Sequence, residues 1–69
     1  MNDPIGSVAE EHALNLAAHD PQRDHHLPAE QDYRNANRDL GRDMTSLERY
    51  HYSRVFASEY RRLTEWRNA

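Results

Sequence analysis

Histidine and carboxylate side chains are the first candidates for chemistry in this sequence, because together they can bind a metal ion. His12 and His19 are seven residues apart and would share one face of a helix. His25 and His26 are adjacent, and two aspartates lie close to them in the sequence. Imidazole and carboxylate ligands suit zinc or nickel, but the sequence contains neither an H-x-x-x-H nor an H-E-x-x-H spacing. We therefore predict no metal site and no cofactor.

Motifs for nucleophilic catalysis and phosphate binding are also missing from the sequence. There is no cysteine and no G-x-S-x-G motif. Gly6 and Gly41 are the only glycines, so no glycine-rich loop can hold a phosphate. A chain of 69 residues also has little depth for an enclosed pocket. We therefore predict that the protein is not an enzyme.

The segment SLERYHYSRVFASEYRRLTEW, residues 46–66, interleaves aromatic side chains with arginines. At about 100° per residue, its apolar side chains fall on one face of a helix. Such a stripe packs either against the other helices of the chain or against a second copy, and Trp, Tyr and Arg left uncovered are frequent in interface hot spots. The residues that we assign to a protein interface are Arg49, Tyr52, Phe56, Glu59, Tyr60, Leu63, Trp66 and Arg67.

Glu59 is the one acidic residue within this apolar stripe. A carboxylate in an apolar seam must be paired or remain in contact with water. In a dimer, an arginine of the second copy would pair with Glu59. In a monomer, the side chain would reach water at the edge of a small core.

Residues 37–50, NRDLGRDMTSLERY, resemble a helix-turn-helix of the repressor and resolvase kind. Leu40 and Gly41 match the turn of that motif, and Asp43 matches its capping residue. Leu47 matches the buried position of the second helix. A DNA-binding transcriptional regulator is therefore the alternative function.

The resemblance implies that Thr45, Ser46 and Arg49 face DNA bases or phosphates, with Arg42 beside them. The sequence departs from the pattern at two positions. Asn37 stands where the motif has a small apolar residue, and Arg42 stands at a turn position that is usually buried. The net charge of −3 also opposes DNA binding, which draws on a basic surface.

Capping and turn residues predict three helices, over about 8–19, 29–41 and 46–67. Ser7 and Thr45 each precede a glutamate by three residues, the pattern of a capping box at a helix N-terminus. Two prolines break the chain between the first two helices, and Gly41 ends the second. We expect residues 1–6 to be a flexible lead-in and residues 7–69 to form a single all-α domain, a small three-helix bundle.

The composition gives this domain little material for a core. Leu, Ile, Val and Phe together make up about 14% of the chain, below the roughly 20% at which disorder becomes a concern. No cysteine is present to form a disulfide. We therefore expect a homodimer, or binding to a partner, to complete the core.

Charge is divided along the chain. Residues 1–32 carry seven Asp or Glu and one Arg, whereas residues 33–69 carry eight Arg and five Asp or Glu. The N-terminus lacks the basic region and apolar run of a signal peptide, and no segment approaches the roughly 20 apolar residues of a membrane span. We expect a cytoplasmic protein that does not bind membranes.

These observations favour a small interaction module without enzymatic activity. We expect it to bind a larger protein, whose identity the sequence does not give, and to regulate or inhibit it. Small, charge-rich helical proteins of viruses or mobile elements that disable a host factor have this character. Nucleic acid is the alternative partner.

Overall fold

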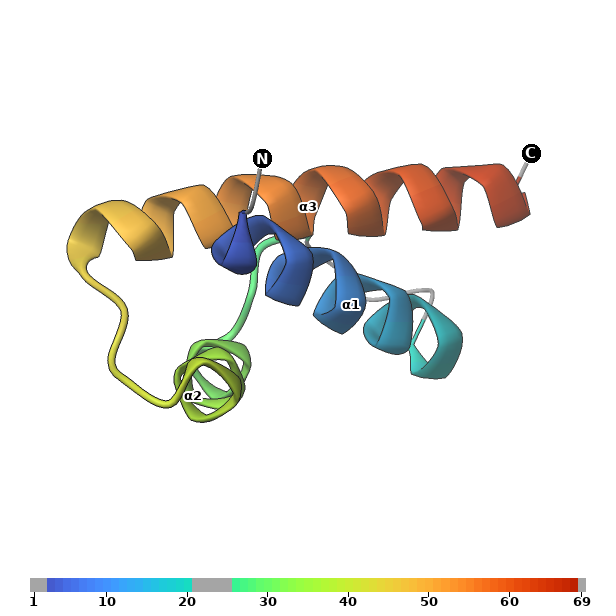
Figure 1. Cartoon of the computed structure of the whole chain (residues 1–69). Coiled ribbons are helices and arrows are strands. Elements are labelled where there is room, and N and C mark those ends of the chain that lie inside the picture. The colour runs from blue at the N-terminus through green and yellow to red at the C-terminus, as the bar shows by residue number, and fades with distance from the viewer. Residues whose placement is uncertain (1–2, 21–25, 69) are drawn as a thin grey trace.

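The residues that the structure describes fold into three helices. The computed structural model describes residues 3–20 and 26–68, with side chains described as far as residue 65. The helices are α1 (Pro4–His19), α2 (Glu30–Leu40) and α3 (Ser46–Asn68), and the described residues contain no strand. The prediction of an all-α fold with two short helices and a long C-terminal helix is confirmed. α1 lies along α3, whereas α2 is seen nearly end-on below them and so runs across both (Figure 1).

α1 begins four residues earlier than the sequence predicted. The carboxylate of Asp3 accepts a hydrogen bond of 3.0 Å from the N–H of Gly6, so Asp3 rather than Ser7 caps the helix. Pro4 follows at the first helical position, where its fixed φ favours the helix and its missing N–H removes nothing. The expected lead-in is therefore partly helical, and Ile5 is buried in the core.

The turn between α2 and α3 follows the residues that predicted it. Gly41 ends α2 with φ 76°, in the left-handed region, and its N–H donates to the carbonyl of Asn37 at 2.9 Å. At the start of α3, the N–H of Glu48 donates to Thr45 Oγ1 at 3.2 Å, and the carboxylate of Glu48 accepts from the N–H of Thr45 at 2.9 Å. The predicted capping box at Thr45 is confirmed.

The core lies mainly between a face of alanines on α1 and an aromatic ladder on α3. Ala9, Ala13 and Ala17 recur every four residues along α1 and are almost fully buried. Three aromatic side chains recur at the same spacing on α3 and belong to the same core cluster. The ring centroids of successive members of this ladder, Tyr52, Phe56 and Tyr60, lie 5.7 and 6.4 Å apart. Small side chains on one helix thus leave room for large ones on the other.

α2 joins this pair of helices through ring contacts near the start of α3. Tyr33 of α2 lies with its ring centroid 5.5 Å from that of Tyr52. The guanidinium of Arg49 lies 4.2 Å from the centroid of the Tyr33 ring, a cation–π arrangement. Ala36 adds a fully buried methyl group from the same helix. α2 therefore covers the N-terminal end of the aromatic ladder.

Substitution Ala13→Leu tests the close approach of α1 and α3. Three extra carbon atoms at a fully buried site should overpack the interface between the helices and lower the free energy of unfolding by about 1–3 kcal/mol. Urea denaturation followed by circular dichroism at the helix band measures this change. Ala18→Leu, on the exposed side of the same helix, is the matched control and should change stability by less than about 0.5 kcal/mol. Equal effects of the two substitutions would contradict the packing described.

Candidate functional site

The aromatic residues that the sequence assigned to a protein interface lie inside the chain. Tyr52, Phe56 and Tyr60 are at most 1% exposed, and they share the core cluster with the alanines of α1. This corrects the interface prediction for these three residues, because α1 covers the stripe that a partner was expected to cover. The sequence did not show how closely a face of alanines lets α1 approach α3.

The hydroxyl of Tyr52 takes part in a polar network that connects all three helices. It lies 2.8 Å from His12 Nδ1 on α1 and 3.2 Å from the carbonyl oxygen of Asp32 on α2. His12 Nε2 lies in turn 2.7 Å from Asp39 Oδ2. Burial, and then the charge of Asp32, raise the pKa of Tyr52 above its usual range, so the hydroxyl stays protonated. The network therefore holds the helices together instead of supplying a tyrosinate nucleophile.

The other predicted interface residues fall at the edge of the core. Glu59 pairs within the chain with Arg62, one turn further along α3, at 2.7 Å. Its half-buried carboxylate is thus satisfied without a second copy. Leu63 is half-buried against the core, and Arg49 lies 3.5 Å from the carboxylate of Glu30. The side chains of Trp66 and Arg67, also predicted for the interface, lie outside the described residues.

The helix-turn-helix resemblance fails at its buried position. Leu47 was expected to occupy the buried position of the second helix of the motif, but it is 77% exposed. The cap of α3 is Thr45, not Asp43. Asn37, which departed from the motif, instead accepts a hydrogen bond of 2.8 Å from the N–H of Met44 and so holds the turn. Residues 37–50 therefore connect two helices through a turn, but the helices do not pack in the way that the DNA-binding motif requires.

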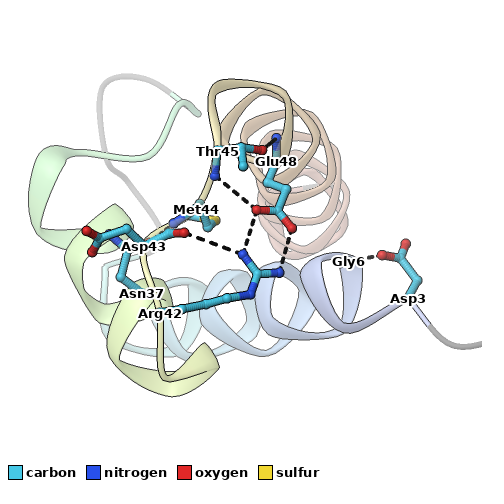
Figure 2. A network of polar contacts seen from close by, with 8 residues as sticks. All are labelled: Asp3, Gly6, Asn37, Arg42, Asp43, Met44, Thr45 and Glu48. Atoms are coloured by element: carbon cyan, nitrogen blue, oxygen red, sulfur yellow. Dashed lines mark hydrogen bonds and ion pairs between the residues drawn. The ribbon is translucent and has the colours of Figure 1, made fainter.

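The cationic groups proposed for nucleic acid are also already engaged within the chain. Figure 2 shows Arg42 reaching from the turn to Glu48 in the first turn of α3. Its two terminal nitrogens lie 2.7 and 2.6 Å from the two carboxylate oxygens, a bidentate pair. Arg49 is occupied by Glu30 and by the Tyr33 ring. Ser46 and Thr45 are exposed, but no free arginine lies with them in the first turn of α3.

Glu48 is the most strongly perturbed carboxylate among the described residues. The hydrogen bonds from Arg42, and then from the N–H of Thr45, lower the pKa of Glu48 to about 2. The folded-state pKa is below the value of 4.5 for a free glutamate. Glu48 therefore stabilises the fold fully above a pH of about 4.5, and this contribution is lost as the pH falls through about 2.

Substitution Glu48→Gln should therefore change how the melting temperature depends on pH in the acidic range. At neutral pH the variant should melt at a lower temperature than the wild type, because the ion pair with Arg42 is gone. The difference in Tm should shrink as the pH falls from about 4.5 to about 2, where Glu48 of the wild type becomes protonated. Glu11→Gln on the exposed side of α1 removes the same charge as a control. A Tm difference that stays constant over this pH range would argue against the assignment.

An exposed row of side chains runs along α3 on the side away from α1. Leu47, Tyr50, Arg54 and Ser58 are spaced by three or four residues and are all exposed; we refer to these four residues as the outer face of α3. Leu47 is 77% exposed and Tyr50 is 60% exposed. The guanidinium of Arg54 lies 5.7 Å from the centroid of the Tyr50 ring. The aromatic ladder that packs against α1 lies on the opposite side of α3, and these four side chains stay exposed.

Two open grooves border the outer face of α3. One, of about 720 Å³, is lined also by Ile5 and Val55, and the other, of about 420 Å³, is lined also by Leu27. Tyr50, Arg54 and Ser58 line both grooves and so form the ridge between them. Sequence reasoning missed this face because it assigned Leu47 to the interior. The available signal was a pair of large apolar residues, three positions apart, on the polar side of the predicted helix.

Other types of site find no support in the described part of the chain. Among the residues 3–20 and 26–68, no three His, Asp or Glu side chains come together in a way that could hold a metal ion. His25, one of the histidines considered as a ligand, lies outside the described residues, whereas His12 and His19 lie on α1. None of the described helices combines the length and the apolar character needed to cross a membrane.

Comparisons with known proteins give no relative from which a function could be transferred. No protein-family model, no curated protein and no solved structure matches this chain significantly. The functional argument therefore depends on the geometry described above.

Proposed function

We propose that this chain is a protein–protein interaction module without enzymatic activity, and that the outer face of α3 is its binding surface. The observation that carries the proposal is the exposure of Leu47 and Tyr50 beside Arg54. Aromatic and arginine side chains are enriched in the hot spots of protein interfaces, where they fill or border grooves of the partner. The grooves on either side of the ridge offer room for the side chains of the partner.

The module binds a larger protein and regulates or inhibits it. A chain of 69 residues has little volume for chemistry of its own, but it can block or reshape a surface of its target. The proposal also includes two predictions from the sequence. The protein is predicted to be cytoplasmic, and it is predicted to belong to a virus or mobile element and to act on a host factor.

Binding to DNA is the weaker proposal for the same chain. It requires arginines free to contact phosphates, and Arg42 and Arg49 each have a carboxylate within the chain. It also requires Leu47 in the interior of the motif. A DNA binder of this kind would lose affinity steeply with salt and on changing Arg42 or Arg49 to Ala.

Affinity capture with a matched pair of leucine variants tests the proposed function. Leu47→Ser on α3 and Leu14→Ser on α1 each remove an exposed leucine, 77% and 56% exposed respectively, and should leave the fold intact. The tagged wild type and the Leu14→Ser variant should retain the same protein from a nuclease-treated lysate, identified by mass spectrometry. Loss of a hot spot should reduce capture by the Leu47→Ser variant about tenfold or more.

If both leucine variants capture the partner equally well, the proposal that the outer face of α3 is the binding surface is wrong. Nucleic acid retained when nuclease is omitted, with no protein partner, would move DNA binding to first place. The far-ultraviolet circular dichroism spectra of the three proteins should coincide, which separates a loss of binding from a loss of structure.

We also propose that two copies of the chain associate through the edge of the core. The apolar stripe of α3 that was first assigned to a dimer interface is covered by α1. Along the edge of this stripe, three residues spaced by four positions stay half-buried: Val55, Glu59 and Leu63. An apolar edge of this kind is completed by a second copy of the same edge across a two-fold axis.

Association of two copies predicts that stability depends on protein concentration. Because a dimer binds only folded chains, Tm should rise by a measurable amount for each tenfold increase in concentration, and sedimentation equilibrium should give a mass near twice that of the monomer. Substitution Leu63→Glu should abolish both effects, whereas Leu14→Ser should abolish neither. A Tm independent of concentration, with a monomer mass, would contradict the homodimer.

A further inference from the structure

Arg54 differs from the other arginines whose side chains are described on α3. Arg49, Arg61 and Arg62 each have a carboxylate within the chain, at 3.5, 3.3 and 2.7 Å respectively. Arg54 makes no ion pair with any residue that the structure describes, and its guanidinium lies instead near the ring of Tyr50. The outer face of α3 therefore presents one cationic group whose counter-charge is not supplied by the described chain.

The grooves on either side of this guanidinium combine apolar and polar side chains. Leu47 and Val55 line the larger groove with Arg54, and Leu27 lines the smaller one. Glu48 and Glu59 also line the larger groove, and each of these carboxylates is paired with an arginine within the chain. The planar guanidinium of an arginine can bind a carboxylate through two parallel hydrogen bonds, and the ring of Tyr50 lies beside that of Arg54. Contact with a partner would remove water from these apolar neighbours and so strengthen the ion pair.

The geometry points to an acidic, apolar segment of another protein as the occupant of this face, with one carboxylate on Arg54 and an apolar side chain against Leu47. This inference rests on the proposed function and names the chemistry of the partner. Leu47 and Arg54 are seven residues apart, which is about 10 Å along a helix. A partner helix with an apolar residue and a carboxylate about two turns apart matches this spacing.

A carboxylate fits this site better than a nucleic-acid phosphate. Nucleic acids are held by several free cations along their backbone. Here the neighbouring arginines, Arg61 and Arg62, already have carboxylates from Glu65 and Glu59. One guanidinium on this face without an ion pair among the described residues, with Leu47 and Val55 near it, instead matches a protein segment in which one charge is set among apolar residues.

A photo-crosslinker placed on the ridge identifies the occupant. Benzoylphenylalanine in place of Tyr50 keeps an aromatic ring at the centre of the outer face, and the same residue in place of Leu14 on α1 is the matched control. After irradiation in a lysate, mass spectrometry of the crosslinked peptide gives both the partner and the contacting segment. The expected product joins position 50, and not position 14, to a segment that contains Asp or Glu among apolar residues.

Charge reversal with the purified partner then tests the role of Arg54. Arg54→Glu should weaken binding about tenfold or more, and Arg54→Lys should weaken it less, because lysine keeps the charge but loses the planar fork. Arg34→Glu, at an exposed position of α2, makes the same change of charge and should leave Kd within about twofold. A partner variant in which the contacting acidic residue is changed to Lys should bind the Arg54→Glu variant well and the wild type weakly.

The outcomes separate this inference from the proposed function. A crosslinked partner whose Kd is unchanged by Arg54→Glu, or whose contacting segment has no carboxylate, overturns the acidic segment and leaves the interaction module standing. A crosslink to a second copy of the chain, or to nucleic acid, overturns the inference by naming another occupant. The absence of any crosslink from position 50 overturns both proposals.

Discussion

The close contact between the alanine face of α1 and the aromatic ladder of α3 is the constraint on which the rest of the structure depends. A chain with so few large aliphatic residues must bury its aromatic rings to form a core, and each fully buried ring such as Phe56 stabilises the fold by about 1.5–3 kcal/mol. Rings of this size pack between two helices only if the opposite face is small, and Ala9, Ala13 and Ala17 provide that face. The same contact determines which residues remain for function, because every ring used in the core is withdrawn from the surface.

Polar side chains then place α2 relative to this pair of helices. α2 contributes few large apolar side chains, with Ala36 as its one fully buried apolar residue among those described. The network of Tyr52, His12 and Asp39 links it to both other helices, and none of the described buried side-chain polar atoms lacks a hydrogen-bond partner. Hydrogen bonds add direction where the apolar contact is small, since an unpaired polar group in the interior would be destabilising. The position of α2 is therefore set by specific hydrogen bonds more than by apolar area.

Local signals in the sequence predicted the local features of the fold. Gly41 and the Thr45–Glu48 box act within one turn of the chain, and their geometry is as their residue types require. The apolar stripe of α3 was also recognisable from its period. What covers that stripe was not, because the choice between α1 and a second copy depends on the distance at which two helices pack. Asp3 was missed as a cap because Ser7 offered a capping-box pattern and residues 1–6 were expected to be a flexible lead-in, although proline is well suited to the first turn.

The same distinction explains why the surface was harder to predict than the core. A motif such as a helix-turn-helix prescribes residue types at given positions, and the segment around Leu47 meets several of them. Whether a leucine points inward depends on where neighbouring helices lie, and here α1 packs against the aromatic ladder of α3 and leaves Leu47 exposed. Leu47 and Tyr50 are therefore left in water beside an arginine without a partner among the described residues. Water solvates these two large apolar side chains unfavourably, and their position on one face beside Arg54 is the physical basis of the proposed binding surface.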